Sequence, residues 1–297
     1  MNRRSLYVAS ISHSEWNKWF LSSAIILTAI AAPVAADQCC RCRPTLLTWD
    51  GCPADPLPSP SARPLVGDRP DFTEASSVVG LGVMQLEAGY TYTRDDSLTP
   101  TESHTAPEAL LRIGMVAEWF ELRLGYTSAR EQDGGITNSG GEDMFVGMKI
   151  AVTQQDCWLP EVAFLGELQI PTGSAGLTAD QVLPRGGLIY GWELNNCWST
   201  AGQTIFAEAL DDRTANSYFE VSQSWTVGVS LTDNVGAYAE WFSIIPHDAD
   251  TNQTESFFDG GLTFLLTPNL QWDVRGGVGL NGAADDYFVG SGFVLRR

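Results

Sequence analysis

The stretch MQLEAGYTYT, residues 84–93, alternates apolar side chains with polar or small ones without a break. Leu86 and Tyr90 fall on one face of this stretch, and Gln85 and Glu87 fall on the other. Successive side chains of a β-strand point to opposite faces, so a period of two predicts a strand with one apolar face. That face contacts either a protein core or lipid, and the rest of the chain must decide between them.

Twelve stretches after the N-terminal region repeat this pattern, and none of that sequence has helical periodicity. Glycines are spread through the stretches, which disfavours helices. We therefore predict an all-β protein of about twelve antiparallel strands, preceded by a short irregular segment. The expected strands lie near residues 81–94, 107–118, 121–130, 142–153, 160–171, 186–194, 201–210, 216–230, 235–245, 256–266, 270–280 and 285–296.

The composition of the two strand faces indicates a membrane protein. The apolar face is rich in Trp, Tyr and Phe, while the polar face carries Gly, Glu and Arg, a mixture that suits a hydrated lumen against a lipid-facing exterior. Strands of ten to twelve residues also suit a tilted membrane crossing. We predict a transmembrane antiparallel β-barrel over residues 81–297. A secreted soluble β-sandwich is the alternative, because alternation alone fits both folds.

The connections between the expected strands support the barrel. Even-numbered strands lead to the next through short turns, such as 119–120 and 267–269. Odd-numbered strands mostly lead into longer polar loops, such as 95–106, 131–141 and 172–185. Short turns at one end and long loops at the other are typical of outer-membrane barrels.

The N-terminal region predicts export. Basic residues precede an apolar run over 20–32, and small residues at 33–36 suit a signal peptidase, so residues 1–36 are predicted to be a signal peptide cleaved near Ala36. The net charge of −19 then becomes about −21 in the mature chain. So acidic a protein is a poor partner for nucleic acid, because phosphate binding needs Lys and Arg. Residues 37–80 are expected to form a Cys- and Pro-rich periplasmic segment, and a possible plug, before the barrel.

Six cysteines in an exported chain indicate an oxidising compartment. For the four in residues 39–52, local disulfides are favoured over a lipid-anchored N-terminus or a zinc site, because the sequence matches neither motif. Cys157 and Cys197 each precede a Trp in a short turn, and we weigh a disulfide between them against two separate thiols. The clustered cysteines, whose pairing stays open, are Cys39, Cys40, Cys42 and Cys52.

The sequence offers no catalytic constellation. The two histidines of the mature chain, His104 and His247, fall in expected loops, and no Gly-x-Ser-x-Gly motif is present. Residues 248–254 begin like a calcium loop but lack its glycine, so a solvated acidic loop is favoured. We therefore predict that the protein is not an enzyme and has no cofactor and no metal site.

Ionisable residues on the inward face of the strands are the main functional candidates. Charges lining a barrel either sort solutes by sign or pair with one another to fill the lumen, and both interpretations stay open. Acids outnumber bases by eight to four in this set, so some acids are expected to contact water, and a pathway would disfavour anions. The set is Glu87, Arg112, Arg123, Lys149, Glu167, Glu193, Glu208, Glu220, Glu240, Asp259, Asp273 and Arg275.

The motif DRPDFTE, residues 68–74, followed by QLEAGY at 85–90, resembles the bacterial family described as putative MetA-pathway of phenol degradation. The last strand, ADDYFVGSGF at 284–293, is similar to the closing strand of that family. The resemblance covers residues 67–297 and implies an outer-membrane barrel of the transporter kind, with uptake of aromatic compounds implied by the name. Such barrels end on an aromatic residue that the barrel assembly machinery reads, whereas here Phe293 precedes Leu295-Arg296-Arg297.

The segment before the first strand is a candidate plug. It has no strand pattern and is expected either to fold back into the barrel or to cap its rim; its residues are Asp68, Arg69, Asp71, Phe72 and Glu74. The sequence thus predicts an outer-membrane barrel that passes or binds small molecules, with lipid and a small solute as partners. A non-conducting structural barrel and the soluble sandwich are the alternatives.

Overall fold

The computed structural model describes residues 45–47, 63–96, 100–133, 135–211 and 213–297. The predicted signal peptide and the cysteines clustered between residues 39 and 52 lie outside the described residues, so both stay predictions. No helix in the described ranges is long and apolar enough to cross a membrane.

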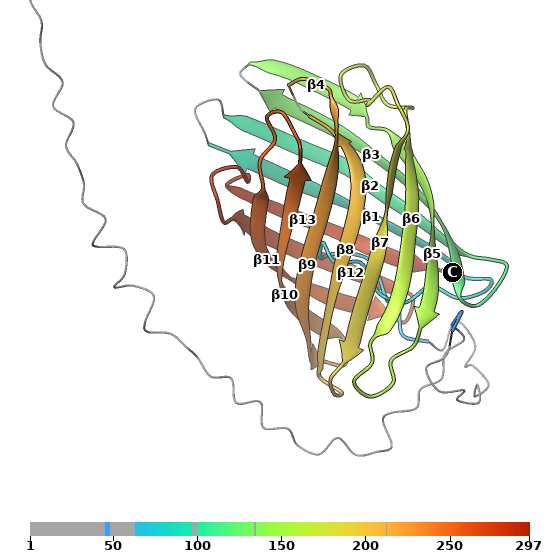
Figure 1. Cartoon of the computed structure of the whole chain (residues 1–297). Helices are drawn as coiled ribbons and strands as arrows, with labels where there is room; N and C mark the ends of the chain where they lie inside the picture. The colour runs from blue at the N-terminus through green and yellow to red at the C-terminus, as the bar shows by residue number, and fades with distance from the viewer. Residues whose placement is uncertain (1–44, 48–62, 97–99, 134, 212) are drawn as a thin grey trace, which may run out of the picture. The chain divides into compact units, whose positions relative to one another are not determined.

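One antiparallel sheet closes on itself, because β1 pairs with β13 on one side and with β2 on the other (Figure 1). β4 pairs with residues 128–133 of β3 and β5 with residues 120–125, so these two strands share one position in the ring. The predicted twelve-stranded barrel is confirmed, and the sandwich is excluded. The strands are β1 (Met84–Asp95), β2 (Thr101–Gly114), β3 (Phe120–Asp133), β4 (Ile136–Gly141), β5 (Met144–Thr153), β6 (Glu161–Ile170), β7 (Leu183–Glu193), β8 (Trp198–Leu210), β9 (Ser217–Thr232), β10 (Val235–His247), β11 (Glu255–Thr267), β12 (Leu270–Gly279) and β13 (Tyr287–Arg296).

Alternation along each strand separates an apolar exterior from a largely polar interior. On β1, Leu86 and Tyr90 are exposed outside, whereas Gln85 and Glu87 are buried inside. Large apolar patches are rare on soluble monomers, and a continuous apolar exterior is what a lipid-embedded barrel requires. Exposed apolar side chains around the ring include Met148, Leu168, Leu188, Trp225, Trp241, Phe258, Trp272 and Phe293.

On β8 the alternation is offset by one residue from the expected one. Gln203 and Ile205 are buried inside, while Phe206 is exposed and stacks on Phe219 of β9 with 5.9 Å between ring centroids. The register pairs Glu208 with Phe219, and paired residues of adjacent strands share a face. Glu208 therefore lies on the outer face, and its prediction as a lumen residue is wrong. Adjacent apolar residues caused the error. Whichever set of alternate residues of β8 is assigned to the inner face, one of Ile205 and Phe206 points inward.

The predicted alternation of short turns and longer loops is confirmed. Two residues each, 233–234 and 268–269, connect β9 to β10 and β11 to β12, whereas residues 171–182 connect β6 to β7. We call the end with the short turns the turn rim and the opposite end the loop rim. The long loop is fixed by Asp143, whose Oδ1 accepts hydrogen bonds from the backbone N–H of Thr172 (3.0 Å) and Gly173 (2.8 Å).

Strands extend further toward the loop rim than the sequence indicated. β2 begins at Thr101 rather than near residue 107, with a register shift between Thr105 and Glu108. Pro107, which has no N–H to donate, lies in that irregularity, where a missing ladder bond is tolerated. His104 is consequently a strand residue whose Nδ1 lies 2.9 Å from the Tyr90 hydroxyl, so its assignment to a loop is wrong.

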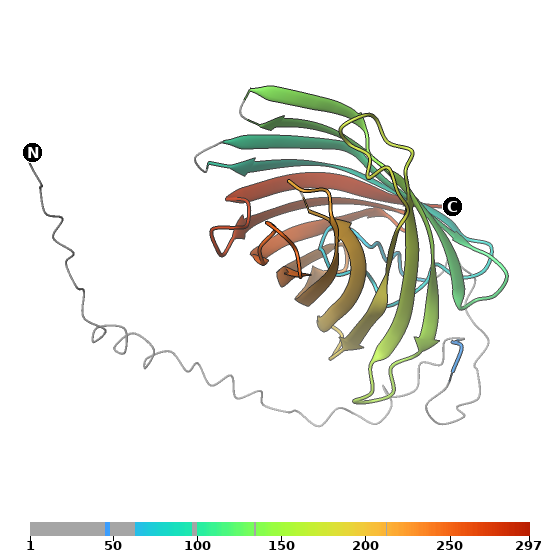
Figure 2. The ribbon, with the colours of Figure 1, turned by 45° about the horizontal axis from the view of Figure 1, so that its top comes forward.

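Residues 63–80, which we call the inner segment, run as an irregular coil inside the ring of strands (cyan in Figures 1 and 2). The segment enters and leaves at the turn rim, where Glu118 Oε2 accepts hydrogen bonds from Arg63 Nη1 (2.9 Å) and the backbone N–H of Leu81 (3.2 Å). The chain leaves across Gly114, at which an added Cβ would lie 1.6 Å from the carbonyl oxygen of Gly80. Only glycine permits this backbone crossing.

Candidate functional site

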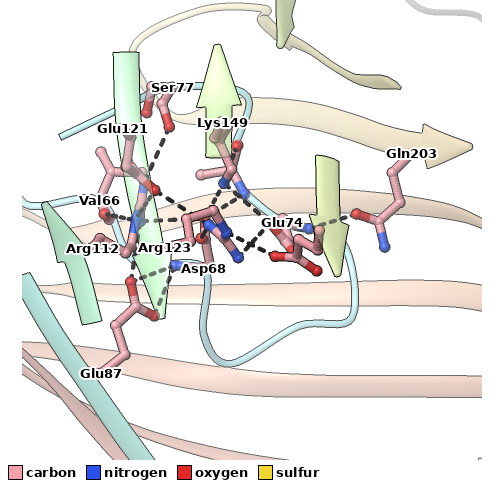
Figure 3. Close-up of polar contacts among 12 residues, drawn as sticks. Val66, Asp68, Glu74, Ser77, Glu87, Arg112, Glu121, Arg123, Lys149 and Gln203 are labelled. Carbon is pink, nitrogen blue, oxygen red and sulfur yellow. Dashed lines mark hydrogen bonds and ion pairs between the residues drawn. The ribbon is translucent and has the colours of Figure 1, made fainter. Parts of the chain in front are cut away.

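One side of the lumen is a cluster of buried cations, which we call the cationic wall: Arg112 of β2, Arg123 of β3 and Lys149 of β5. All three converge on Asp68 of the inner segment, with N–O distances of 3.2 Å from Arg112, 2.5 Å from Arg123 and 2.8 Å from Lys149 (Figure 3). Burial raises the pKa of the Asp68 carboxyl, but the three cations outweigh it and hold that pKa below its ordinary value. Asp68 is therefore an anion in this site.

A second acid of the inner segment binds the same wall. Glu74 lies 2.9 Å from Arg123 and 3.2 Å from Lys149, and these cations outweigh burial and lower its pKa. The cations also bind backbone oxygens of the segment: Lys149 donates to the carbonyl of Ala75 (3.0 Å) and Arg112 to that of Ser77 (3.1 Å). Breaking a buried ionic network by removing one member is strongly destabilising, so the segment is held firmly on this side.

Acids of the strands complete the network. Glu121 accepts from Arg112 Nε (2.8 Å) and from the backbone N–H of Val79 (2.9 Å). Glu87 of β1 accepts hydrogen bonds from the backbone N–H groups of Asp68 (3.0 Å) and Arg69 (3.1 Å) in the inner segment. The carboxylates thus orient the arginines and bind the inner segment directly.

The opposite side of the lumen carries acids instead of bases, and we call Glu240 of β10 and Asp259 of β11 the acidic wall. Glu240 accepts from the backbone N–H groups of Phe72 (2.6 Å) and Thr73 (2.8 Å) and from the Thr73 hydroxyl. Next to them, Gln203 of β8 donates to the carbonyl oxygen of Phe72 (2.8 Å). The acidic wall therefore binds N–H and O–H donors of the inner segment, whereas the cationic wall binds its carboxylates and carbonyl oxygens.

Phe72 occupies an aromatic cluster inside the barrel. Its ring stacks on Phe242 with 4.3 Å between centroids and 7° between planes. The cluster continues through Phe257, whose ring centroid lies 4.8 Å from that of Phe242, and Phe288. Aromatic stacking of this kind adds to the free energy gained from burying the ring.

Arg69 extends toward the seam between β1 and β13. Its guanidinium lies 2.8 Å from Glu108 and 3.3 Å from Asp273. Added Cβ atoms on Gly89 and Gly292 would lie 2.3 Å and 2.4 Å from atoms of the Arg69 side chain. These two glycines therefore create the space that the side chain occupies.

Most of the predicted lumen residues are buried inside the barrel, and two lie elsewhere. Glu193 lies at the turn-rim end of β7 and is exposed, and Glu208 lies outside. The expectation that surplus acids contact water is wrong for Glu240 and Asp259, which are 1% and 2% exposed. Inside and buried are Glu87, Arg112, Arg123, Lys149, Glu167, Glu240, Asp259 and Asp273, with Glu220 and Arg275 partly buried.

Four residues of the site were missed from the sequence. Glu121 is two residues before Arg123 and shares its face, so one further step along the alternation identifies it. Glu108 requires the same extension of β2. Arg185 was assigned to a loop but lies 3.4 Å from Glu167. Gln203 was missed because the expected alternation of β8 placed it on the outer face, whereas it is buried inside.

Both alternatives weighed for Cys157 and Cys197, a disulfide between them and two separate thiols, are wrong. Cys157 is disulfide-bonded, but Cys197 carries a free, exposed thiol. The two turns do meet, through Gln155, whose Oε1 accepts from the backbone N–H of Glu193 at 2.7 Å. Cys197 lies beyond this contact, in a turn where its own N–H donates to Asn195 Oδ1 (2.8 Å).

The described residues contain no group of three or more His, Cys, Asp and Glu side chains arranged to hold a metal ion. In the loop that begins like a calcium site, Asp250 accepts from Thr214 Oγ1 (2.8 Å) and Asn216 Nδ2 (2.7 Å). Its carboxylate thus joins two loops.

Comparison with known families identifies the chain. The profile of the family described as "Putative MetA-pathway of phenol degradation" matches residues 67–296. The chain belongs to this family. The match begins at the inner segment and ends at the last residue of β13, so the family profile spans the segment and the barrel together.

No curated protein matches the chain. Among solved structures, a "KdgM porin in complex with disordered oligogalacturonate" is 9% identical, with a TM-score of 0.46 over 71% of this chain and 98% of that one. The β domain of the Bordetella autotransporter BrkA is 15% identical, with a TM-score of 0.45 over 73% and 99%. The "CymD monoaromatic hydrocarbon channel" is 10% identical, with a TM-score of 0.40 over 73% and 88%. We draw no functional argument from similarities this distant.

Proposed function

We propose that the protein is an outer-membrane channel for small solutes and that the inner segment is its plug. One observation carries the proposal: the lumen is filled by a separate coil, not by the side chains of the wall alone. Within the described residues, that coil is joined covalently to the wall only through residues 81–83 at the turn rim, so it can move without breaking any strand pairing. A structural barrel has no need of a removable filling.

The apolar exterior supports the membrane location, and the family supports the transporter class. In the outer membrane, the turn rim would face the periplasm and the loop rim would face the exterior of the cell, as in other barrels with short turns at one end. Export through a signal peptide cleaved near Ala36 and insertion by the barrel assembly machinery belong to the same proposal. The described part of the chain presents no catalytic grouping, and both histidines pack against outward rings, His104 on Tyr92 and His247 on Phe219.

The aromatic cluster favours aromatic compounds as solutes. Once Phe72 leaves, the rings of Phe242, Phe257 and Phe288 face the lumen, where a planar apolar solute stacks as Phe72 does. The cationic and acidic walls carry charges of opposite sign, so an ion of either sign meets one wall of like charge, and a neutral aromatic solute is favoured.

Conductance in planar bilayers tests the proposal. A variant lacking residues 67–76 should conduct steadily, whereas the full-length protein should be mostly closed. Heat-modifiable migration of both proteins on gels serves as the control, because it shows that each barrel has folded. A folded deletion variant that neither conducts nor admits solutes into liposomes would leave the structural barrel as the function.

A further inference from the structure

The two acids of the acidic wall face each other without a base between them. Glu240 and Asp259 are directly opposite in the register of β10 and β11 and point to the same inner face. Like charges in this arrangement are destabilising, and burial makes them more so. Neither carboxyl forms an ion pair with any described residue, although both are almost completely buried.

Hydrogen bonds satisfy three of the four carboxyl oxygens. Both oxygens of Glu240 accept from the inner segment, and Asp259 Oδ2 accepts from the Tyr238 hydroxyl at 2.8 Å. Asp259 Oδ1 is buried without a hydrogen-bond partner. An unpartnered buried carboxylate oxygen opposite a second carboxylate is the position where a proton is bound.

A third carboxyl comes from the inner segment. Burial raises the pKa of Asp71 well above its ordinary value, and the charges of Glu240, Asp259 and Asp68 raise it further. Asp71 is adjacent in sequence to Phe72, whose backbone N–H is bound by Glu240. Docking the segment thus adds the charge of Asp71 to the field of the two acids of the acidic wall.

The other charged groups that face this site are occupied elsewhere. Arg275 of β12 donates to the carbonyl oxygen of Pro70 (3.0 Å) and lies 3.7 Å from Glu108. Asp273 is paired with Arg69, and Asp68 with the cationic wall. No base among the described residues forms an ion pair with either acid of the acidic wall. The charge of Arg275 acts on Asp259 from beyond ion-pair distance and compensates the two acids only in part, so bound protons are needed to neutralise the rest.

We propose, building on the function proposed above, that the acidic wall with Asp71 is a proton-controlled latch on the plug. With protons bound, an O–H of one carboxyl donates to an oxygen of its neighbour, and Phe72 and Thr73 stay docked. When the protons leave, two or three negative charges face each other, and undocking relieves this repulsion by admitting water and removing Asp71.

The sign of the pH dependence follows from linkage. A carboxyl whose pKa is raised on docking stabilises the docked state at low pH, and this stabilisation is lost as the pH rises through the raised pKa. The plug is therefore docked in acid and released as the pH rises. The cationic wall does not contribute in this range, because the pKa of Asp68 is shifted downward.

Hydrogen exchange of the Phe72 and Thr73 amides in intact protein in detergent tests the latch from pH 5 to 9. Asp259→Asn removes one of the facing charges, so it should stay docked at high pH. Comparing the proteins at each pH cancels the intrinsic pH dependence of exchange. The ratio of wild-type to variant rates should be near one in acid and rise about tenfold per pH unit for each proton released.

Two further variants complete the design. Asp71 lies in the inner segment, so Asp71→Asn leaves the strands intact and tests the latch even if Asp259→Asn folds poorly. This variant should also weaken the pH dependence of amide exchange at residues 72–73. Glu208→Gln removes a carboxylate from the outer face and should keep the wild-type profile.

A constant ratio from pH 5 to 9 overturns the latch. A ratio that changes with added Na⁺ or Ca²⁺ at fixed pH overturns it as well, because the acids would then hold a metal cation instead of a proton. Exchange does not depend on conduction. A failed latch is therefore distinguishable from a failed channel, which the deletion of residues 67–76 tests separately.

Discussion

The two walls of the lumen bind the same segment by opposite means. The cationic wall pairs Asp68 and Glu74 with three fixed cations, a contact that is insensitive to pH near neutrality. In the acidic wall, Glu240 binds backbone N–H groups of the segment, and neither Glu240 nor Asp259 forms an ion pair with a described base. On our proposal, one side of the inner segment is therefore an anchor and the other a releasable contact.

Removing the anchor should have the largest effect. Asp68→Ala leaves Arg112, Arg123 and Lys149 buried with one acid fewer, and breaking such a network typically costs about 3–5 kcal/mol. We expect the segment to undock at every pH, measured as fast amide exchange over residues 67–76 and as steady conductance. Protection that persists in this variant would show that the cationic wall is not the anchor.

Phe72→Ala should come next. The change removes the stack on Phe242 and leaves a cavity in the aromatic cluster, for a loss of about 3 kcal/mol of docking free energy. The anchor stays intact, so exchange should accelerate at residues 72–73 while the amide of Asp68 stays protected. Uniform loss of protection along the segment would show that the two walls do not act separately.

Gly89→Ala tests the space for Arg69. The added Cβ would lie 2.3 Å from Arg69 Cζ, and relieving such overpacking costs about 2 kcal/mol. Gly282→Ala is the matched control, since nothing lies within 4 Å of its added Cβ. If the inner segment docks equally well in both variants, Arg69 reaches Glu108 and Asp273 in a different side-chain conformation.

The smallest change is Thr73→Val, which keeps the shape of the side chain and removes its hydroxyl. That hydroxyl bonds Glu240 and lies 2.5 Å from Ser224, so we expect a loss of about 1 kcal/mol. The effect should be confined to the acidic wall and appear as a modest rise in the exchange of residues 72–73.

The barrel and its strand number were predictable because a period of two, repeated twelve times, is compatible with few folds. Orientation failed only on β8, where adjacent Ile205 and Phe206 make both frames look alike. The predicted hydrated lumen is also incomplete as a description, because Ala163, Leu165, Ile189 and Ile205 form a buried apolar cluster. Alternation along a strand shows only that its two faces differ in polarity. It does not show whether the inner face contacts water or packed protein.

Many residues of the site were predictable from the sequence, but their pairings were not. Sequence spacing shows that Arg112 and Arg123 face inward, yet nothing in it shows that they converge on Asp68, 44 and 55 residues before them. Arg69 and Glu240 show the same limit, since their contacts depend on how a coil without periodicity folds inside the ring. Long-range contacts of irregular chain have no local sequence signal.

The position of the inner segment has a consequence for how the barrel assembles. The segment is joined to β1, which closes the ring against β13, where Met84 and Arg297 exchange backbone hydrogen bonds. On β1, Glu87 is bound by the backbone of Asp68 and Arg69. The inner segment is therefore synthesised before the strands and can bind β1 before β13 pairs with it. We expect the barrel to close around the inner segment.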